Sequence, residues 1–331
     1  MKNNKKTIVL AFGGNAITRE GQKGTFQEQL ANIAVSCRDV VELARAGYRM
    51  VITHGNGPQV GSLLIKNELA RDVVPPMPLD VCVANTQGSL GFGIQQTLEN
   101  MFAKAGINRE MASIITRVEV DPRDEAFSRP TKPIGPFFAQ RDALELMAAK
   151  GYTMREDSGR GWRRVVPSPR PLAILEKRVI KRLVEDDVIV VGVGGGGIPV
   201  VLGPDGYSGV EAVIDKDLAA QRLALDIGAD ILVILTGVPR VYADFRKPTQ
   251  RALEWITVSQ AREYLSAGQF PPGSMGPKIE AAASFVEESG GRAVITDFET
   301  LHAALDGRGG TTIISDRMVK ETQTKTGGGS G

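Results

Sequence analysis

The fold class follows from one stretch of the sequence, Arg49-Met50-Val51-Ile52-Thr53-His54-Gly55-Asn56-Gly57-Pro58-Gln59-Val60-Gly61. Residues 50–52 form an apolar run typical of a buried strand, and the run ends abruptly in a Gly/Asn turn. Gly55 and Gly57 have no side chain to keep a ligand from the backbone, and Pro58 suits the first helical position. The pattern predicts a helix amino terminus whose N–H groups and dipole favour a phosphate or carboxylate. The alternative is a plain strand-to-helix connection, since glycines are common in such loops.

A second strand with a glycine turn lies near the amino terminus. Residues 7–12 are apolar and predict a central strand, which ends in Gly13-Gly14-Asn15-Ala16. Between the two strands, residues 27–46 carry apolar side chains at helical spacing, and Gly47 ends this predicted helix. A strand, a helix and a strand in this order predict two neighbouring parallel strands. In parallel sheets ligands bind beyond the carboxyl ends of the strands, where both glycine turns would lie.

Composition and charge limit the classes of partner. The 331 residues include 42% hydrophobic side chains, which indicates a globular protein with a sizeable core. The formal net charge is only +2, so neither nucleic acid nor an anionic membrane is expected as the main partner. Cys37 and Cys82 form no Cys-x-x-Cys pair and fit a reducing compartment. No stretch has the length and hydrophobicity of a signal peptide or a transmembrane helix, and we expect a soluble cytoplasmic protein.

The rest of the chain alternates between predicted helices and strands. Further helices are predicted over residues 59–70, 85–105, 217–227 and 279–288, and further strands over residues 112–117, 188–193, 231–235, 293–296 and 310–314. Residues 119–165 interrupt this pattern with four prolines and dense charge, which predicts a small subdomain, with a long surface loop as the alternative. From residue 317 the chain is polar and ends in a Gly/Ser-rich sequence, which predicts a flexible tail.

A third glycine-rich segment, Gly192-Val193-Gly194-Gly195-Gly196-Gly197, formally matches the G-x-G-x-x-G dinucleotide fingerprint. That fingerprint requires a helix next, whereas residues 198–202 predict a strand, so we reject the dinucleotide interpretation. Residues 203–206, Gly-Pro-Asp-Gly, then predict a hairpin turn. The segment remains a candidate turn for the approach of a phosphate, with a conformational hinge as the alternative.

Two lysines indicate a reaction class. Lys216 and Lys278 each lie beside a predicted helix start, where a positive charge opposes the helix dipole and needs an anionic partner. Lysines near anion-binding turns favour phosphoryl transfer, which depends on positioning and charge neutralisation, and Asp217 is placed to orient an ammonium group. For either lysine alone, an ordinary solvated charge is the alternative. Neither His54 nor His302 resembles an obligatory general base, which indicates an acceptor that is already ionised, a carboxylate or a carbamate.

Six separated motifs together resemble the carbamate kinases of the amino-acid kinase superfamily. They are Gly13-Gly14-Asn15-Ala16, His54-Gly55-Asn56-Gly57-Pro58-Gln59-Val60-Gly61, Thr131-Lys132-Pro133-Ile134-Gly135, Val166-Pro167-Ser168-Pro169-Arg170-Pro171, Ala212-Val213-Ile214-Asp215-Lys216-Asp217 and Ser274-Met275-Gly276-Pro277-Lys278. They occur in order between residues 7 and 314, which makes the resemblance highly specific.

The resemblance implies an α/β fold, an open αβα sandwich with a mostly parallel central sheet and a small protruding subdomain. It implies a homodimer that transfers a phosphoryl group reversibly between ATP and carbamate, giving ADP and carbamoyl phosphate, and that works toward ATP synthesis in catabolism. The kinase domain would span residues 1–316, with a carbamate and phosphoryl lobe over 1–205, a nucleotide lobe over 206–316 and the subdomain over 119–165. Residues 317–331 would be the tail.

The resemblance also assigns roles to individual residues. The catalytic group would consist of Lys132, Lys216, Lys278 and Asp217, with Lys132 brought in from the subdomain. The carbamate and phosphoryl site would be lined by Gly13, Gly14, Asn15, Gly55 and Asn56. The nucleotide would be bound near Thr236, Gly237, Val238, Tyr242 and Met275. Mg²⁺ would be held through the nucleotide phosphates, so no dedicated set of metal ligands is implied.

One position separates carbamate kinases from their relatives. Many other amino-acid kinases, such as acetylglutamate kinase, carry a lysine two residues before the first Gly-Gly, whereas this chain has Ala11 there. Carbamate kinases share this absence and use the subdomain lysine instead, so Ala11 together with Lys132 favours carbamate as the acceptor. Two alternatives remain open: a nucleotide or metabolite sensor of the same fold without turnover, and a kinase for another small carboxylic acid.

Overall fold

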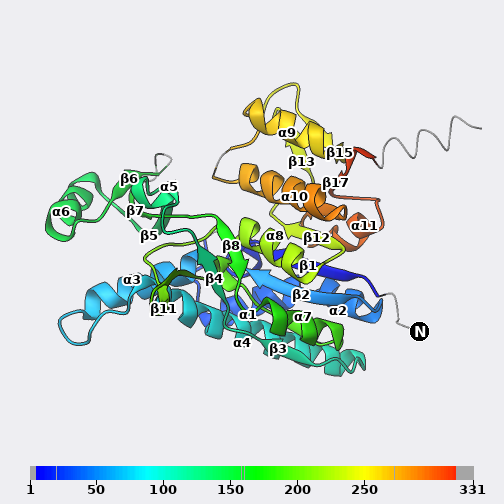
Figure 1. The fold of residues 1–331 in the computed structure, drawn as a ribbon, viewed down its shortest axis with the longest axis horizontal. Helices are drawn as coiled ribbons and strands as arrows, with labels where there is room; N and C mark the ends of the chain where they lie inside the picture. Colours follow the sequence, from blue (N-terminus) through cyan, green and yellow to red (C-terminus); the bar gives the residue numbers. More distant parts are fainter. Residues whose placement is uncertain (1–4, 20, 158, 160, 272, 318–331) are drawn as a thin grey trace, which may run out of the picture.

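The computed structural model describes residues 5–19, 21–157, 159, 161–271 and 273–317. An eight-stranded sheet runs through the centre with helices on both faces (Figure 1). Across the sheet the strands are, in order, β15 (Trp255–Thr257), β17 (Thr311–Ile314), β16 (Arg292–Thr296), β12 (Ile231–Leu235), β1 (Thr7–Phe12), β2 (Arg49–His54), β9 (Ile189–Val191) and β3 (Met111–Ser113). Each neighbouring pair is parallel except β16 with β17. The prediction of a mostly parallel α/β sheet is confirmed, and the predicted tail beyond Arg317 lies outside the described residues.

The two faces of the sheet pack against different helices because strand side chains alternate in direction. Ile8, Leu10 and Phe12 of β1 belong to one buried cluster, and Val9 and Ala11 belong to the other. The first cluster includes residues of α1 (Phe26–Ser36), α2 (Arg38–Arg45), α4 (Leu79–Ala105) and α11 (Leu301–Leu305). The second includes residues of α7 (Lys177–Glu185), α8 (Lys216–Ile227), α9 (Val258–Ser266) and α10 (Met275–Ser289). The core therefore forms two layers around a central sheet that is buried on both sides.

A small subdomain stands away from this body, as predicted (Figure 1). Its sheet has three antiparallel strands, β5 (Lys132–Phe138), β7 (Trp162–Val166) and β6 (Met154–Glu156), accompanied by α5 (Glu125–Ser128) and α6 (Gln140–Lys150). A four-stranded sheet consists of β11 (Gly206–Gly209), β10 (Ile198–Gly203), β4 (Arg117–Val120) and β8 (Pro171–Ile174). The strand after the third glycine turn is β10, and it forms the predicted hairpin with β11, so the rejection of a dinucleotide fingerprint is confirmed.

Several predicted boundaries are wrong for local reasons. The helix predicted over residues 27–46 is divided at Cys37 into α1 and α2. Next to this break, the Ser36 hydroxyl donates to the carbonyl of Ala16, which belongs to the glycine turn after β1. The helix predicted from residue 85 begins at Leu79, because Pro78 is extended and serves as its N-cap. The last long helix begins at Met275 rather than at residue 279, which places Lys278 in its first turn.

The strand predicted over residues 112–117 is also wrong. Its residues are divided between β3 of the main sheet and β4 of the four-stranded sheet. The two strands separate at Thr116, whose N–H donates to the side chain of Gln87 rather than to a neighbouring strand. The segment after residue 238, where the sequence predicts no helix or strand before residue 279, contains β13 (Val241–Ala243), β14 (Arg251–Leu253), β15 and α9. Strands of three residues are too short to show a period in sequence.

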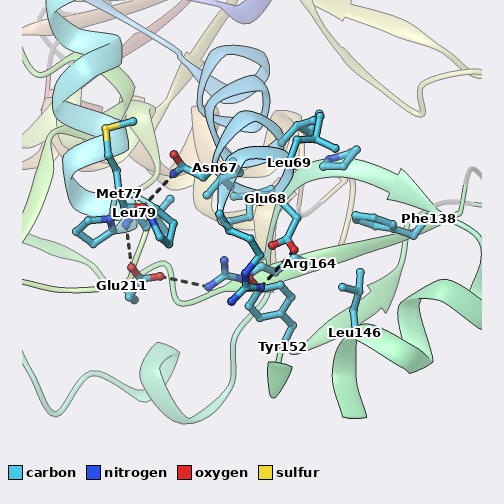
Figure 2. Close-up of a pocket in the computed structure, with 18 of the residues that line it drawn as sticks. Asn67, Glu68, Leu69, Met77, Leu79, Phe138, Leu146, Tyr152, Arg164 and Glu211 are labelled. Carbon is cyan, nitrogen blue, oxygen red and sulfur yellow. Dashed lines mark hydrogen bonds and ion pairs between the residues drawn. The ribbon is translucent and has the colours of Figure 1, made fainter. Parts of the chain in front are cut away.

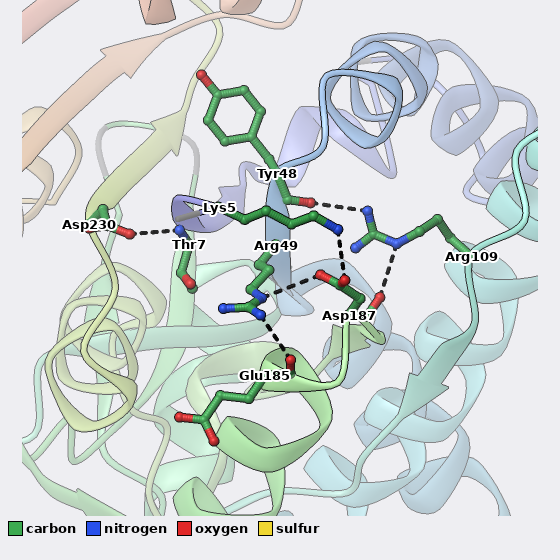
Figure 3. Close-up of polar contacts among 8 residues, drawn as sticks. All are labelled: Lys5, Thr7, Tyr48, Arg49, Arg109, Glu185, Asp187 and Asp230. Carbon is green, nitrogen blue, oxygen red and sulfur yellow. Dashed lines mark hydrogen bonds and ion pairs between the residues drawn. The ribbon is translucent and has the colours of Figure 1, made fainter. Parts of the chain in front are cut away.

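A polar cluster joins three strands at the amino-terminal edge of the sheet (Figure 3). Lys5 Nζ and Arg49 Nε lie 2.7 and 3.3 Å from the Asp187 carboxylate, and Arg109 Nε donates to the Asp187 carbonyl at 2.9 Å. The hydrogen bond from Lys5 is the main cause that holds the pKa of Asp187 below its ordinary value. These contacts fasten the starts of β1, β2 and β9 at the edge opposite to the glycine turns. Within the described residues, no helix has the length and hydropathy that crossing a bilayer requires.

Candidate active site

Three glycine turns meet at the carboxyl edge of the main sheet. They follow β1, β2 and β9, which are consecutive parallel neighbours, so the predicted placement of the turns is confirmed. A Cβ at Gly13 would lie 2.7 Å from the carbonyl oxygen of Leu235, and one at Gly55 would lie 3.9 Å from the Gly14 nitrogen. The first turn therefore packs on the end of β12 as well as beside the second turn. Glycine is required at Gly13 because no side chain fits against that carbonyl.

Asp217 bridges two of the predicted lysines on neighbouring helices. Lys216 Nζ lies 2.6 Å from Asp217 Oδ1, and Lys278 Nζ lies 2.9 Å from Asp217 Oδ2. The Asp217 side chain is 4% exposed and each lysine side chain is 16% exposed. Burial would raise the pKa of Asp217, but the charges of Lys216 and Lys278 outweigh it and hold that pKa below its ordinary value. The carboxylate is therefore ionised and fixes both ammonium groups in place.

The third lysine reaches the same helix start from the subdomain. Lys132, the first residue of β5, places its Nζ 2.7 Å from Asp215 Oδ2. Asp215 is the N-cap of α8, and its other oxygen accepts the N–H of Asp217 at 2.9 Å. Because Asp215 and Asp217 flank Lys216, three ammonium groups from three separate elements converge on the first turn of α8. This turn also lies against the second glycine turn, since a Cβ at Gly55 would lie 3.3 Å from Lys216 Cδ.

The glycine loop, residues 192–197, packs directly on the side chains of the second turn. A Cβ at Gly194 would overlap the His54 ring, and a Cβ at Gly195 would overlap the Asn56 amide. A Cβ at Gly196 would lie 2.5 Å from the carbonyl oxygen of Ile214, two residues before Lys216. The loop thus fills the space between the β2 turn and the start of α8, and its glycines are required by close approach. Asn56 is 4% exposed and lies beneath this loop rather than on an open surface.

His54 is held neutral. Its side chain is buried, its Nδ1 lies 3.0 Å from the Gly55 carbonyl oxygen, and so Nδ1 carries the proton and donates. Burial, with a smaller contribution from the nearby charge of Lys216, lowers the pKa of His54 to about 4. With a pKa of about 4, the remaining lone pair on Nε2 is too weakly basic to serve as an effective general base near pH 7. The structure therefore agrees with an acceptor that arrives ionised.

This buried histidine predicts a pH dependence of stability. Its folded pKa of about 4 lies below the unfolded value of about 6.5, so the unfolded state takes up the proton first as the pH falls. We expect the free energy of unfolding to decrease between about pH 6.5 and pH 4, by roughly 3 kcal/mol from this group. Urea denaturation of the wild type and of His54→Gln at several pH values measures this. The dependence of the free energy of unfolding on pH should be weaker in His54→Gln than in the wild type. It should be unchanged in His302→Gln, because the His302 side chain is 56% exposed. Equal slopes in all three proteins would contradict it.

The predicted nucleotide residues belong to three separate segments of the chain. Thr236, Gly237 and Val238 directly follow β12. A Cβ added to Gly13 would lie 3.7 Å from the Cα of Thr236, so this segment lies next to the first glycine turn. Met275 is the first residue of α10, one turn before Lys278. Tyr242 lies on β13, and the centroid of its ring lies 6.2 Å from that of the Phe245 ring. The backbone of Asn15 lies in η1 (Gly14–Ala16), and its side chain lies outside the described part of the structure.

Sequence reasoning missed three residues of this region. Asp215 was recognised within a motif but given no role, although an aspartate directly before a helix is an N-cap pattern. Thr86 and Gln87 of α4 are buried and make hydrogen bonds to Asn56 and to the glycine loop. They fall on the buried face of α4, in register with Leu79, Val83 and Leu90. Polar residues on an otherwise apolar helix face are the signal that would have identified them.

Within the described residues, no cluster of three or more His, Cys, Asp or Glu side chains is arranged to hold a metal ion. Both carboxylate oxygens of Asp217 are occupied by lysines.

A separate cavity of about 510 Å³ lies between the body and the subdomain (Figure 2). Its walls are mostly apolar and include side chains of α3 (Gly57–Ala70), residues 76–79, β5 and α6. Its charged groups are paired: Glu68 with Lys150, and Arg164 with Glu211 at 3.2 Å. The predicted site residues do not line this cavity. It therefore marks the gap between subdomain and body rather than the chemical centre.

Comparison with known proteins agrees with this geometry. The sequence model described as "Amino acid kinase family" matches residues 6–297. The carbamate kinase of Pyrococcus furiosus is 46% identical over 311 residues, which cover 93% of this chain and 99% of that protein. The chain belongs to the carbamate kinases of the amino acid kinase family. Carbamate kinase 1 of Enterococcus faecium is 48% identical over 298 residues, 89% of this chain and 94% of that protein.

The three-dimensional structure is also similar to that of a solved carbamate kinase. The solved structure of carbamate kinase from Giardia lamblia bound to AMP-PNP is 43% identical, with a TM-score of 0.90. It covers 96% of this chain and 100% of that chain. The coverage includes the main sheet and the subdomain, so the family predicted from six sequence motifs is confirmed across the whole fold.

Proposed function

We propose that the protein transfers a phosphoryl group reversibly between ATP and carbamate, giving ADP and carbamoyl phosphate. The observation that supports this most directly is the convergence of Lys132, Lys216 and Lys278 on the first turn of α8, beside three glycine turns. Backbone N–H groups and ammonium groups at one point provide the positioning and charge neutralisation that phosphoryl transfer requires. The carbamate kinase relatives carry the activity in their names, and the absence of a lysine at Ala11 fits the same acceptor.

In the proposed reaction the lysines follow the charge as it moves. A terminal phosphate oxygen of ADP attacks the phosphorus of carbamoyl phosphate, the bond from phosphorus to the carbamate oxygen breaks, and ATP and carbamate result. Both nucleophile and leaving group are anions, so no side chain has to remove a proton, in keeping with the neutral His54. Lys216 and Lys278 stabilise the charge on the transferring group, Asp217 holds both in place, and Lys132 contacts the acceptor side.

Mg²⁺ is expected to accompany the nucleotide. Coordinated by nucleotide phosphates, the ion would neutralise charge on the β- and γ-phosphate oxygens. The protein would bind the nucleotide along Thr236, Gly237, Val238, Tyr242 and Met275, and Gly13, Gly14, Asn15, Gly55 and Asn56 would shape the carbamate and phosphoryl side. The residues at this edge fit that arrangement because each Asp217 oxygen is paired with a lysine, so the carboxylate already serves to hold two ammonium groups.

The test is ATP formation by the purified protein from ADP, Mg²⁺ and carbamoyl phosphate. In the other direction, ATP should be consumed with carbamate and not with acetylglutamate, aspartate or glutamate at equal concentration. If ATP is consumed with one of the other acids and not with carbamate, the proposed acceptor is wrong. ADP binding in calorimetry without ATP formation would favour a non-catalytic sensor.

Lys132→Ala tests the assignment of the subdomain lysine to the acceptor side. We expect the KM for carbamoyl phosphate to rise and kcat to fall, by roughly 10²-fold in kcat/KM, while the affinity for ADP changes little. The reason is that Lys132 reaches Asp215 from β5 of the subdomain, whereas Lys278 reaches Asp217 from α10. Initial rates and ADP titration measure both quantities. If kcat/KM for carbamoyl phosphate and the affinity for ADP fall by the same factor, Lys132 does not act specifically on the acceptor side.

The remaining assignments are organisation and assembly. We propose a carbamate and phosphoryl lobe over residues 1–205, a nucleotide lobe over 206–316 and the inserted subdomain over 119–165, in a cytoplasmic homodimer that works toward ATP synthesis. The free thiols Cys37 and Cys82 fit a reducing compartment. For the dimer, the support is an exposed apolar patch on α1 and α4, where Phe26 and Phe92 are 40% and 52% exposed and stack on each other. Light scattering on the wild type and on Phe92→Asp tests the dimer and this face.

A further inference from the structure

We infer that Gln87 on α4 is a positioning residue for phosphoryl transfer, because it holds the glycine loop of residues 192–197 in the conformation that the active site uses. This inference rests on the proposed function and adds a residue to it. Gln87 lies on the buried face of α4 and belongs to none of the six motifs that indicate the family.

Gln87 is connected to the loop by a complete set of buried hydrogen bonds. Its side chain is buried, and its Nε2 donates to the carbonyls of Gly194 at 3.0 Å and Thr116 at 3.1 Å. Its Oε1 accepts the N–H of Thr116 at 2.7 Å. The amide orientation is fixed by these partners, since two carbonyls require a donor and one N–H requires an acceptor. Buried bonds of this kind specify one conformation, because any partner left alone is costly.

The loop needs such support because its backbone is strained. Val193 is β-branched and buried, yet its φ is 54°, in the left-handed region that such residues rarely adopt. Gly195, Gly196 and Gly197 follow with φ of 68°, 92° and 85°. The N–H of Val193 donates to the Thr116 hydroxyl at 3.1 Å. Gln87 therefore holds the loop twice, directly at Gly194 and through Thr116 at Val193, and strain of this kind persists only where surrounding contacts enforce it.

The conformation that results presents backbone donors. The N–H groups of Gly196 and Gly197 bond back to the carbonyls of Val193 and Gly194, both at 3.1 Å. Among the backbone hydrogen bonds that the described residues make in turns, loops and caps, none has the N–H of Gly194 or Gly195 as its donor. Successive N–H groups in such a turn form an anion-binding concavity. The loop lies against Asn56 and against the carbonyl of Ile214, two residues before Lys216. We therefore assign these donors to the acceptor half of the site.

The competing interpretation is that Gln87 only fastens α4 to the strands beside it. A second glutamine of the same helix offers a matched control for that role. Gln95 Nε2 donates to the Met111 carbonyl at 3.3 Å, and Gln95 Oε1 accepts the Ser113 hydroxyl at 3.0 Å. Gln95 therefore joins α4 to β3 two turns away from the glycine loop. Loss of its contacts changes the packing of α4 and leaves the loop untouched.

The experiment compares Gln87→Leu with Gln95→Leu in steady-state ATP formation from carbamoyl phosphate. We expect Gln87→Leu to raise the KM for carbamoyl phosphate at least tenfold and to lower kcat, with the KM for ADP within twofold of the wild type. Gln95→Leu should leave all three parameters within twofold, although thermal unfolding shows a loss of stability. If Gln87→Leu leaves the kinetics as in Gln95→Leu, or changes both KM values together, the inference is wrong. A wild type without ATP formation would instead remove the proposed function itself.

Gln87→Glu provides a second readout if Gln87→Leu does not fold. An ionised carboxylate would face the carbonyls of Thr116 and Gly194, whereas the protonated acid can donate to one of them. We expect the KM for carbamoyl phosphate in Gln87→Glu to be raised at pH 8 and to recover by several-fold toward pH 6, relative to the wild type at each pH. A ratio of variant to wild type that does not change with pH would overturn the inference.

Discussion

Lys216→Ala is expected to lower kcat for ATP formation from carbamoyl phosphate by roughly 100-fold, about 3 kcal/mol of lost transition-state stabilisation. Lys278→Ala should lose a similar amount. The physical reason is that each ammonium group is held in place by one oxygen of Asp217, at 2.6 and 2.9 Å, and so needs no reorganisation when charge develops on the transferring group. Initial rates at saturating ADP and carbamoyl phosphate measure the effect, and circular dichroism shows whether each variant is folded.

Lys177→Ala is the matched control for these lysines. Lys177 is 40% exposed and lies 3.6 Å from Asp226, so it also pairs with an aspartate of α8, at the other end of that helix. Its removal should leave kcat within about twofold, since Asp226 lies at the carboxyl end of α8, away from the lysines at its start. A folded Lys216→Ala protein with the turnover of Lys177→Ala would show that Lys216 does not act on the phosphoryl group.

Asp217→Ala is expected to lower the free energy of unfolding by roughly 3–5 kcal/mol, because it leaves two ammonium groups without their buried partner. It should also abolish most turnover, since the lysines lose their positions. The folded pKa of Asp217 is lowered, so its stabilising contribution is present above the unfolded pKa of about 3.9 and is lost as the pH falls toward the folded value. Urea denaturation of the wild type and of Asp217→Ala at pH 7 and at about pH 3 measures the change, and the difference between the two proteins should be smaller at the lower pH.

Asp226→Ala separates stability from catalysis on the same helix. Its carboxylate is 4% exposed, like that of Asp217, and pairs with two cations, Arg222 and Lys177. It also accepts the N–H of Ile174 at 3.1 Å. Removal of Asp226 should therefore also destabilise the protein but preserve kcat at temperatures where it stays folded. If both aspartate variants lose turnover in proportion to their loss of stability, Asp217 has no specific part in the reaction.

The central sheet could be predicted because its strands are apolar on both faces and end in glycine turns. Residues 7–12 and 50–52 fall within β1 and β2, and the helix-to-strand alternation gave their parallel pairing. Residues 112–117 were misassigned because an apolar run does not reveal that Thr116 turns away to bond with Gln87. Short strands such as β13 and β15 are set by their partners in the sheet rather than by their own three residues.

The candidate site could be predicted in part. Its lysines and glycines occur in local motifs, and the structure brings Lys132, Lys216, Lys278 and Asp217 together as expected, while their catalytic roles stay predictions. The contact between Lys132 and Asp215 was not predictable, because it joins residues 83 positions apart, one on β5 and the other at the start of α8. The support from α4 was missed for a related reason: a buried glutamine gains its meaning only when the strained loop beside it is known.

The most direct measurement is a crystal structure of the protein with ADP, Mg²⁺ and aluminium fluoride, which mimics the phosphoryl group in transfer. The account predicts that the Nζ atoms of Lys216 and Lys278 lie within hydrogen-bond distance, about 2.7–3.1 Å, of the mimic's fluorine atoms, with the glycine turns against the same group. Lys132 should approach the mimic from the carbamate side. A mimic bound at another edge of the sheet, with these lysines still paired only to Asp215 and Asp217, would contradict it.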